Sequence, residues 1–254
     1  LEVLEARITY LAYAPEIAAA MLQRQRDVAR WAMACVVHGR WTADGGATRD
    51  PLRMYVKLCR ISAHLRNMND FSGAWALTLA LTSSLVRRVV QPERRRDELA
   101  RIAQAYRRPA GQGQGQGQGE LDPSDDTETL LGRLVELFSP HSNFLVYRTA
   151  LQHARPLGRS TPRSVGARGA VPLIDVHLHD LCMIQDTMPD TVGPNGLLNY
   201  QKVVLQAQHI RATLENQDNI FYILPIAQIM NLLKDWVLPD DKTLNEEAMR
   251  RFVR

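Results

Sequence analysis

The sequence predicts an all-α protein, a single irregular helical domain with a protruding αα-hairpin. Three observations support this fold class. Apolar residues recur three or four positions apart in most segments of the 254-residue chain, which is the spacing of amphipathic helices. No stretch of useful length shows the apolar–polar alternation of a β-strand. Two helical patterns flank the Pro- and Gly-containing segment 189–196, which predicts an antiparallel helix pair.

The first three predicted helices lie within the first 70 residues. The first covers about residues 1–11. Pro15 can open the second, because proline's missing N–H costs little in the first turn, and Gly39 ends it. The predicted buried side of the second helix consists of Ile17, Met21, Val28, Trp31 and Cys35. That of the third, which stops near residues 67–70, consists of Met54, Leu58, Ile61 and Leu65.

The middle of the chain combines helical patterns with one low-complexity segment. Residues 71–81 predict a buried helix centred on Trp75 and Leu79, and residues 91–106 are charged and helix-prone. A strict Gly-Gln alternation at 111–119 cannot bury enough apolar surface to offset its ordering entropy. We expect a disordered loop at about 110–126 inside one domain that covers residues 1–254, because long loop insertions add little closure entropy.

Further helices are predicted at 127–138, across the hairpin, at 223–236 and from 245 to the end. The second helix of the hairpin starts at about residue 198. Its predicted buried side consists of Val203, Ala207, Ile210 and Leu214.

The first helix of the hairpin, between Val171 and Pro189, carries two side-by-side patterns. An apolar stripe consists of Ile174, Leu178 and Leu181, at spacings of four and three. A polar stripe consists of Asp175, His179, Cys182 and Asp186. Such a helix either presents a functional surface or is an ordinary solvated helix.

A metal site is an alternative interpretation of the same segment. Asp175-x-His177-x-His179 resembles the first-strand metal motif of barrel amidohydrolases, in which alternate residues of a strand point into one site. That motif opens a (β/α)8 barrel of about 250 residues. Only 75 residues follow His179, and their pattern predicts helices.

Composition narrows the possible partners and the compartment. The net charge of +4 comes from arginine clusters that lack interleaved aromatic residues, so we expect no nucleic-acid binding. Apolar runs are too short for a membrane span, and no signal peptide opens the chain. Three widely spaced cysteines suit reduced thiols in a cytoplasmic protein. The first residue, Leu1, suggests a domain excised from a longer protein.

Five blocks, taken in order, resemble the catalytic domain of Ras-family guanine nucleotide exchange factors. Together they extend over roughly residues 16–250. The blocks are His64-Leu65-Arg66-Asn67-Met68-Asn69-Asp70-Phe71-Ser72, Leu81-Thr82-Ser83-Ser84-Leu85-Val86-Arg87-Arg88, Asn143-Phe144-x-x-Tyr147-Arg148, Val171-Pro172 through Pro189-Asp190, and Leu198-Asn199-Tyr200 with the helix after it.

The resemblance implies an all-α domain whose helical hairpin enters the nucleotide site of a small GTPase of Ras, Rap or Ral type. GDP is held there by its phosphates, a magnesium ion and a phosphate-binding loop. By alignment, Cys182 crowds the magnesium position and Asp186 replaces phosphate contacts. We add His179 to these catalytic residues. The predicted GTPase-binding residues are Thr82, Arg87, Phe144, Tyr147 and Asp175.

Other implications of the resemblance concern cofactors, chemistry and location. No cofactor or metal site of the protein itself is implied, and the domain is a regulator that acts without covalent chemistry. We expect cytoplasmic protein that is recruited to membranes through regions outside this chain. The aromatic rings of Phe144 and Tyr147 fit a core position equally well, and Asn69 fits the closing turn of a helix.

Three departures from the family pattern motivate a second hypothesis. Thr82 stands where the family has Asn, and Thr supplies no amide. Asp186 is one methylene shorter than the family's usual Glu, and the early helices look shortened. The alternative is therefore a catalytically degenerate module that binds a GTPase without releasing its nucleotide.

Overall fold

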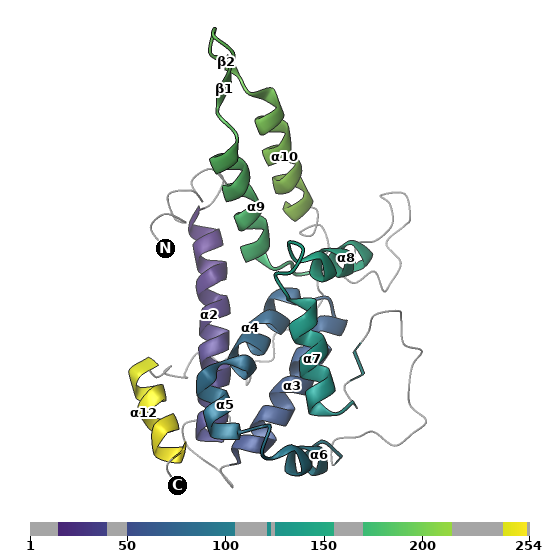
Figure 1. The fold of residues 1–254 in the computed structure, drawn as a ribbon, viewed down its shortest axis with the longest axis vertical. Coiled ribbons are helices and arrows are strands. Elements are labelled where there is room, and N and C mark those ends of the chain that lie inside the picture. Colours follow the sequence, from purple (N-terminus) through teal and green to yellow (C-terminus); the bar gives the residue numbers. More distant parts are fainter. Residues whose placement is uncertain are drawn as a thin grey trace.

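The computed structural model describes residues 15–39, 50–104, 121–122, 125–154, 170–214 and 241–252, and in these ranges the protein is built from helices (Figure 1). The helices are α2 (Pro15–His38), α3 (Pro51–Asn67), α4 (Phe71–Thr82), α5 (Ser84–Val90), α6 (Arg96–Gln104), α7 (Thr127–Leu137), α8 (Leu145–Ala154), α9 (Ile174–Thr187), α10 (Tyr200–Leu214) and α12 (Asp241–Phe252). Two-residue strands β1 (Thr191–Val192) and β2 (Leu197–Leu198) pair at one turn. The predicted all-α fold is confirmed. The predicted helices at 1–11 and 223–236 and the Gly-Gln alternation lie outside the described residues.

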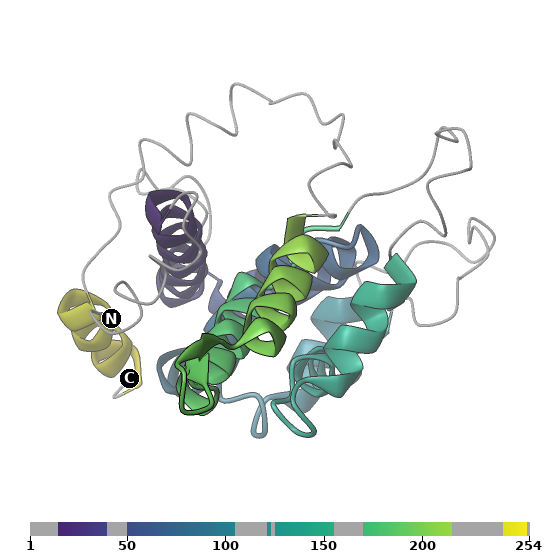
Figure 2. The same ribbon diagram turned by 90° about the horizontal axis from the view of Figure 1, so that it is seen from above.

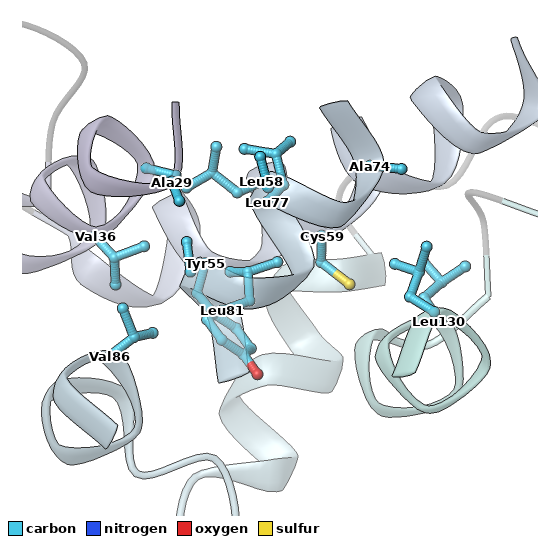
Figure 3. Packing of buried hydrophobic residues seen from close by; sticks show 14 of the residues in the cluster. Ala29, Val36, Tyr55, Leu58, Cys59, Ala74, Leu77, Leu81, Val86 and Leu130 are labelled. Atoms are coloured by element: carbon cyan, nitrogen blue, oxygen red, sulfur yellow. The ribbon is translucent and has the colours of Figure 1, made fainter. Parts of the chain in front are cut away.

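The core lies where α2, α3, α4, α5 and α7 meet (Figure 3). Leu58 of α3, Leu77 of α4 and Leu130 of α7 are almost completely buried there. Burial also raises the pKa of the Cys35 and Cys59 thiols to about 12, so both stay protonated at neutral pH. This is consistent with the expected reduced thiols, and all three cysteines are free.

Three residues predicted to be buried lie at the surface instead. Met21, Ile61 and Leu79 are 38%, 38% and 46% exposed. In α2 the buried stripe is shifted by one position, to Leu22, Gln25, Ala29, Ala32 and Val36. In α4 the small residue Ala74 joins Phe71, Leu77 and Leu81 inside, because neighbouring helices pack closely on it. Apolar spacing predicted these buried faces wrongly, because it counts large apolar residues and overlooks small ones such as Ala74.

Aspartates begin three of these helices. Asp50, Asp70 and Asp126 accept a hydrogen bond from the backbone N–H three residues further on, at 2.8–3.0 Å. This is the N-cap arrangement, which satisfies an otherwise unpaired donor. Asp70 fits tightly, since a Cβ at Gly73 would lie 2.6 Å from its Oδ2. Burial raises the pKa of Asp70, with the Gly73 N–H opposing the shift.

A tight turn joins α3 to α4 and positions the hairpin further along the chain. Asn69 has a φ of 63°, its N–H donates to the carbonyl of Arg66, and the N–H of Asp70 donates to that of Leu65. This pair of bonds is a Schellman motif, in which Asn replaces the usual glycine. The expectation that Asn69 closes a helix turn is confirmed.

The end of the predicted disordered segment belongs to the folded structure. Leu121 is buried, its N–H donates to Oδ1 of Asn67, and its carbonyl accepts from Nδ2 of the same side chain. Asp126 caps α7. Residues 121–122 and 125–126 therefore belong to the described fold.

The hairpin of α9 and α10 rises away from the remaining helices at one end of the molecule (Figure 1). Viewed from above, the two helices lie side by side (Figure 2). The carboxyl-terminal helix α12 lies at the opposite end, against α2 and α5. Nδ1 of His38 is 3.1 Å from Oε2 of Glu247 in that contact. The predicted protruding hairpin is present.

Candidate functional site

The hairpin begins from a backbone anchor on the turn between α3 and α4. The N–H of Val171 donates to the carbonyl of Asn69 at 2.9 Å, and the carbonyl of Val171 accepts from the N–H of Phe71 at 3.0 Å. These bonds form a single parallel bridge between Asp70 and Val171. The segment that enters α9 is therefore fixed to the core by main-chain bonds.

Tyr147 of α8 contacts the first turn of α9 from the core. Its ring is completely buried and lies edge-on to Phe71, with centroids 5.4 Å apart. Its hydroxyl accepts from the N–H of Leu173 at 2.8 Å and lies 3.3 Å from Nε2 of His177. The predicted direct GTPase contact would need an exposed ring, whereas this ring positions α9.

Arg148, the next residue of α8, binds the next turn of α9. One terminal nitrogen donates to Oδ1 of Asp180 at 2.8 Å, and the other lies 2.8 Å from Oδ2 of the same, almost completely buried carboxylate. A hydrogen bond between two charged groups is stronger than one between neutral groups. The same guanidinium donates to the carbonyl and side chain of Asn143 at 2.7 and 3.1 Å. Arg148 thus connects the turn before α8 to the hairpin.

That turn presents apolar side chains next to the base of the hairpin. Ser142, Asn143 and Phe144 have φ values of 51°, 56° and 58°, a left-handed conformation that is unusual for a residue as large as Phe. Phe144 is half-buried against the core, and Leu145 and Val146 are 58% and 46% exposed. We name Phe144, Leu145 and Val146 the apolar platform. Sequence reasoning identified only its first member.

On its other side, α9 is held by α2. Leu22 forms a small buried cluster with Ile174 and Leu178, two residues of the predicted apolar stripe. Nε2 of Gln25 donates to Oδ2 of Asp175 at 2.8 Å. The structure therefore assigns one carboxylate of the predicted polar stripe to a contact within the domain.

The seam between α9 and α10 is polar, which corrects the predicted buried side of α10. Val203 is 41% exposed, Ala207 is also exposed, and Ile210 is only half-buried; the side chain of Leu214 is outside the described part. Lys202, Gln206 and His209 face α9 instead. Nε2 of Gln206 donates to Oε1 of Gln185 at 3.1 Å, and Nδ1 of His209 lies 3.6 Å from Asp180. A search for apolar spacing does not find such a seam.

The outer face of α9 carries the rest of the polar stripe. His179 and Asp186 are exposed, and Cys182 is half-exposed. Met183, 48% exposed, adds an apolar side chain to this part of the helix. The three predicted catalytic residues thus lie together on the protruding element and are accessible to a partner.

Thr82 and Arg87 lie far from this face. Thr82 is the last residue of α4 and Arg87 lies in α5, the next helix. Helix α4 has 12 residues, is about 18 Å long, and has its other end at Phe71, beside the hairpin base. The Thr82 hydroxyl donates to the carbonyl of Thr78 at 2.8 Å within its own helix. Arg87 pairs with Glu93 at 2.8 Å across a shallow surface pocket.

The helix also decides against the alternative metal site. Asp175, His177 and His179 would share a face only on a strand. On α9 the first contacts Gln25, the second contacts Tyr147, and the third is exposed. Among the described residues, no group of three or more His, Cys, Asp or Glu side chains is arranged to hold a metal. No described helix is long and apolar enough to cross a membrane.

A helical body with an anchored, protruding hairpin that bears an acid on its outer face defines the class of this protein. Residues 2–204 match the family model of the RasGEF domain. The chain belongs to the RasGEF family.

Its relatives carry the same domain in longer chains. Ras guanine nucleotide exchange factor P of Dictyostelium discoideum is 24% identical over 225 residues, which are 89% of this chain and 12% of that protein. Factor H of the same organism is 22% identical over 85% of this chain and 28% of its own length, and factor A is 22% identical over 84% and 28%. The chain thus spans about a quarter or less of these curated relatives.

Proposed function

We propose that this domain is a guanine nucleotide exchange factor that promotes GDP release from a Ras-family small GTPase. The hairpin of α9 and α10 would enter beside the phosphate and magnesium site of the GTPase. The observation that carries the proposal is the exposed face of α9, with His179, Cys182 and Asp186 on an element that projects from the body. Family membership supports the same conclusion.

The outer face of α9 supplies the groups that the reaction needs. The side chain of Cys182 would occupy space beside the magnesium ion, and the carboxylate of Asp186 would compete with phosphate for its donors on the GTPase. Exchange needs no covalent bond to form or break. The domain accelerates release by binding the nucleotide-free GTPase more tightly than the GDP-bound form.

The hairpin must be rigid to act as a wedge, and its contacts with the body support that requirement. Main-chain bonds at Val171, the hydroxyl of Tyr147 and the ion pair between Arg148 and Asp180 fix α9 at three successive positions along the chain. A helix held in this way can transmit the binding energy gained elsewhere to the nucleotide site. Tyr147 therefore enters the proposal as a positioning residue.

The docking surface would combine the apolar platform with Thr82, at the end of α4, and Arg87, in α5. The platform lies next to the hairpin base, where apolar exposure of this kind favours a protein contact. Thr82 and Arg87 are about one helix length away, so a partner that touched both regions would cover α4 along its length. We propose that Asp175 supports α9 through its bond to Gln25. Because its side chain is only half-buried, it would also face the edge of the bound GTPase.

Release of fluorescent GDP from Ras-, Rap- and Ral-type GTPases tests the proposal. Acceleration on one member, absent with the Asp186→Ala variant and retained with Glu136→Ala on α7, would support it and name the partner. A folded domain that accelerates release from none of them would refute it. The reaction needs only GTPase, nucleotide and magnesium, because we propose no cofactor of the domain itself.

One observation favours the alternative, a degenerate GTPase-binding module. The Thr82 hydroxyl is already bonded to its own helix, so this position offers a partner little of what an Asn amide would. Affinity separates the two functions. An exchange factor binds nucleotide-free GTPase more tightly than the GDP-bound form, whereas a degenerate module does not. Cytoplasmic location with membrane recruitment from outside this chain remains part of the proposal.

A further inference from the structure

Lys202, near the start of α10, is a charged residue in an almost completely buried position. Only 3% of it is exposed. Burying an ammonium group is costly unless the charge is paired and its donors are bonded. The contacts of Lys202 must therefore account for its place in the seam between α9 and α10.

Its ammonium contacts two groups, one in the last turn of α9 and one just after that helix. Nζ lies 2.5 Å from Oδ1 of Asp190 and 3.3 Å from the backbone carbonyl of Gln185. The backbone N–H of Lys202 donates to Oδ1 of Asn199 at 3.2 Å, so Asn199 caps α10. The charge is thus neutralised by one acid and by the negative end of a helix.

The sequence explains why the carbonyl of Gln185 needs this donor. In a continuing helix its partner would be the N–H four residues later, but that residue is Pro189, which has none. The ammonium supplies the missing bond from another helix. Nδ2 of Asn199 also donates to the carbonyl of Pro189 at 2.9 Å, so α10 holds both ends of this break.

Asp186 follows Gln185 directly. The main chain of Gln185 is held by Lys202 and its side chain by Gln206, both from α10, while Asp186 is exposed on the outer face. We propose that Lys202 is a positioning residue for nucleotide exchange, which fixes the last turn of α9 and thereby the carboxylate of Asp186. The inference rests on the proposed function, and nothing in it requires Lys202 to touch the GTPase.

The test uses Lys202→Met, because Met fills the buried path with an unbranched chain while it removes the ammonium, both its charge and its donors. Hydrogen–deuterium exchange at residues 184–188 should become at least tenfold faster, while α3 and α4 keep their protection. The maximal rate of GDP release should fall at least tenfold. The domain concentration that gives half of this rate should stay within twofold, because the docking surface is unchanged. Lys242→Met, at an exposed position on α12, is the matched control and should change neither quantity.

If Lys202→Met fails to fold, Asp190→Ala carries the test, since the Asp190 side chain is 63% exposed and its removal opens no cavity in the core, while the ammonium of Lys202 keeps its bond to the carbonyl of Gln185. We then expect both effects at about threefold. Unchanged protection at 184–188 in the folded variants would overturn the inference, and so would faster hydrogen exchange with an unchanged rate of GDP release. If the wild-type domain accelerated GDP release from no GTPase, the proposed function would fail. Hydrogen exchange would still show whether Lys202 fixes the last turn of α9.

Discussion

The hydroxyl of Tyr147 lies 3.3 Å from Nε2 of His177, although 29 residues separate the two in the chain. The same oxygen accepts from the N–H of Leu173 at 2.8 Å. The next residue of α8, Arg148, binds Asp180, three residues further along α9. Two consecutive residues of α8 thus fix where α9, the first helix of the proposed wedge, lies along its axis and how it is rotated about that axis.

Tyr147→Phe should therefore destabilise the domain. The variant keeps the ring that packs on Phe71 but leaves the N–H of Leu173 buried without its acceptor, which costs about 1–3 kcal/mol. Denaturant unfolding measures the change. Tyr200→Phe is the control, because Tyr200 is 75% exposed and should lose nothing measurable. Equal stability of the two variants would contradict the role given to Tyr147.

Asp186→Ala should slow GDP release at least tenfold, which corresponds to about 1.4 kcal/mol of lost transition-state stabilisation. The side chain is exposed, so the unfolding midpoint should stay the same. Asp186→Glu, which restores the length usual in the family, should keep or raise the rate. A folded Asp186→Ala variant with the wild-type rate would remove this acid from the mechanism.

Thr82→Asn should raise the rate of GDP release. The present hydroxyl bonds to the carbonyl of Thr78, whereas an amide at the end of α4 can reach a partner with both a donor and an acceptor. We expect a severalfold increase under conditions where the domain is not saturating. Thr243→Asn makes the same replacement at an exposed position on α12 and should have no effect on the rate. A lower rate in Thr82→Asn would show that the family's Asn does not suit this domain.

The cap of α7 should contribute stability that acid removes. The hydroxyl of Thr129 and then its backbone N–H lower the pKa of Asp126 below its ordinary value of 3.8. The contribution is therefore complete above pH 3.8 and is lost as the pH falls through the lowered value. At pH 7, Asp126→Ala should cost about 1 kcal/mol. Urea unfolding at several pH values should show that the difference in unfolding free energy between the wild type and Asp126→Ala becomes smaller below pH 3.8.

The cap of α4 should behave in the opposite way. Burial raises the pKa of Asp70, so its favourable contribution is complete below pH 3.8 and is lost as the pH rises through the raised value. Asp70→Asn keeps the cap acceptor and carries no charge. Its stability relative to the wild type should therefore increase from pH 3.5 to pH 7. A difference that does not change with pH would contradict a raised pKa.

Local signals in the sequence were sufficient for most of the helices and for the wedge. Proline at residue 15 and the stripe through His179, Cys182 and Asp186 depend only on neighbours within a few positions. The buried faces were less predictable. Leu79 is large and apolar yet exposed, while the smaller Ala74 is buried, because helix packing decides which face turns inward.

The polar contacts that hold the hairpin were not predictable in the same way. Lys202, Gln206 and His209 are ordinary surface residues by type, and their place in the seam depends on partners across the turn. The Gln25–Asp175 bond joins residues 150 positions apart. No spacing rule along one helix contains that information.

Because the three cysteines differ in burial, the hairpin can be labelled selectively at one thiol. Cys35 and Cys59 are sealed in the core, whereas Cys182 stands half-exposed on the outer face of α9. A thiol-directed fluorophore should therefore attach at this one place without any engineered cysteine. Its emission would report whether the surroundings of α9 are water or protein, so that arrival of the hairpin at a partner could be followed in real time.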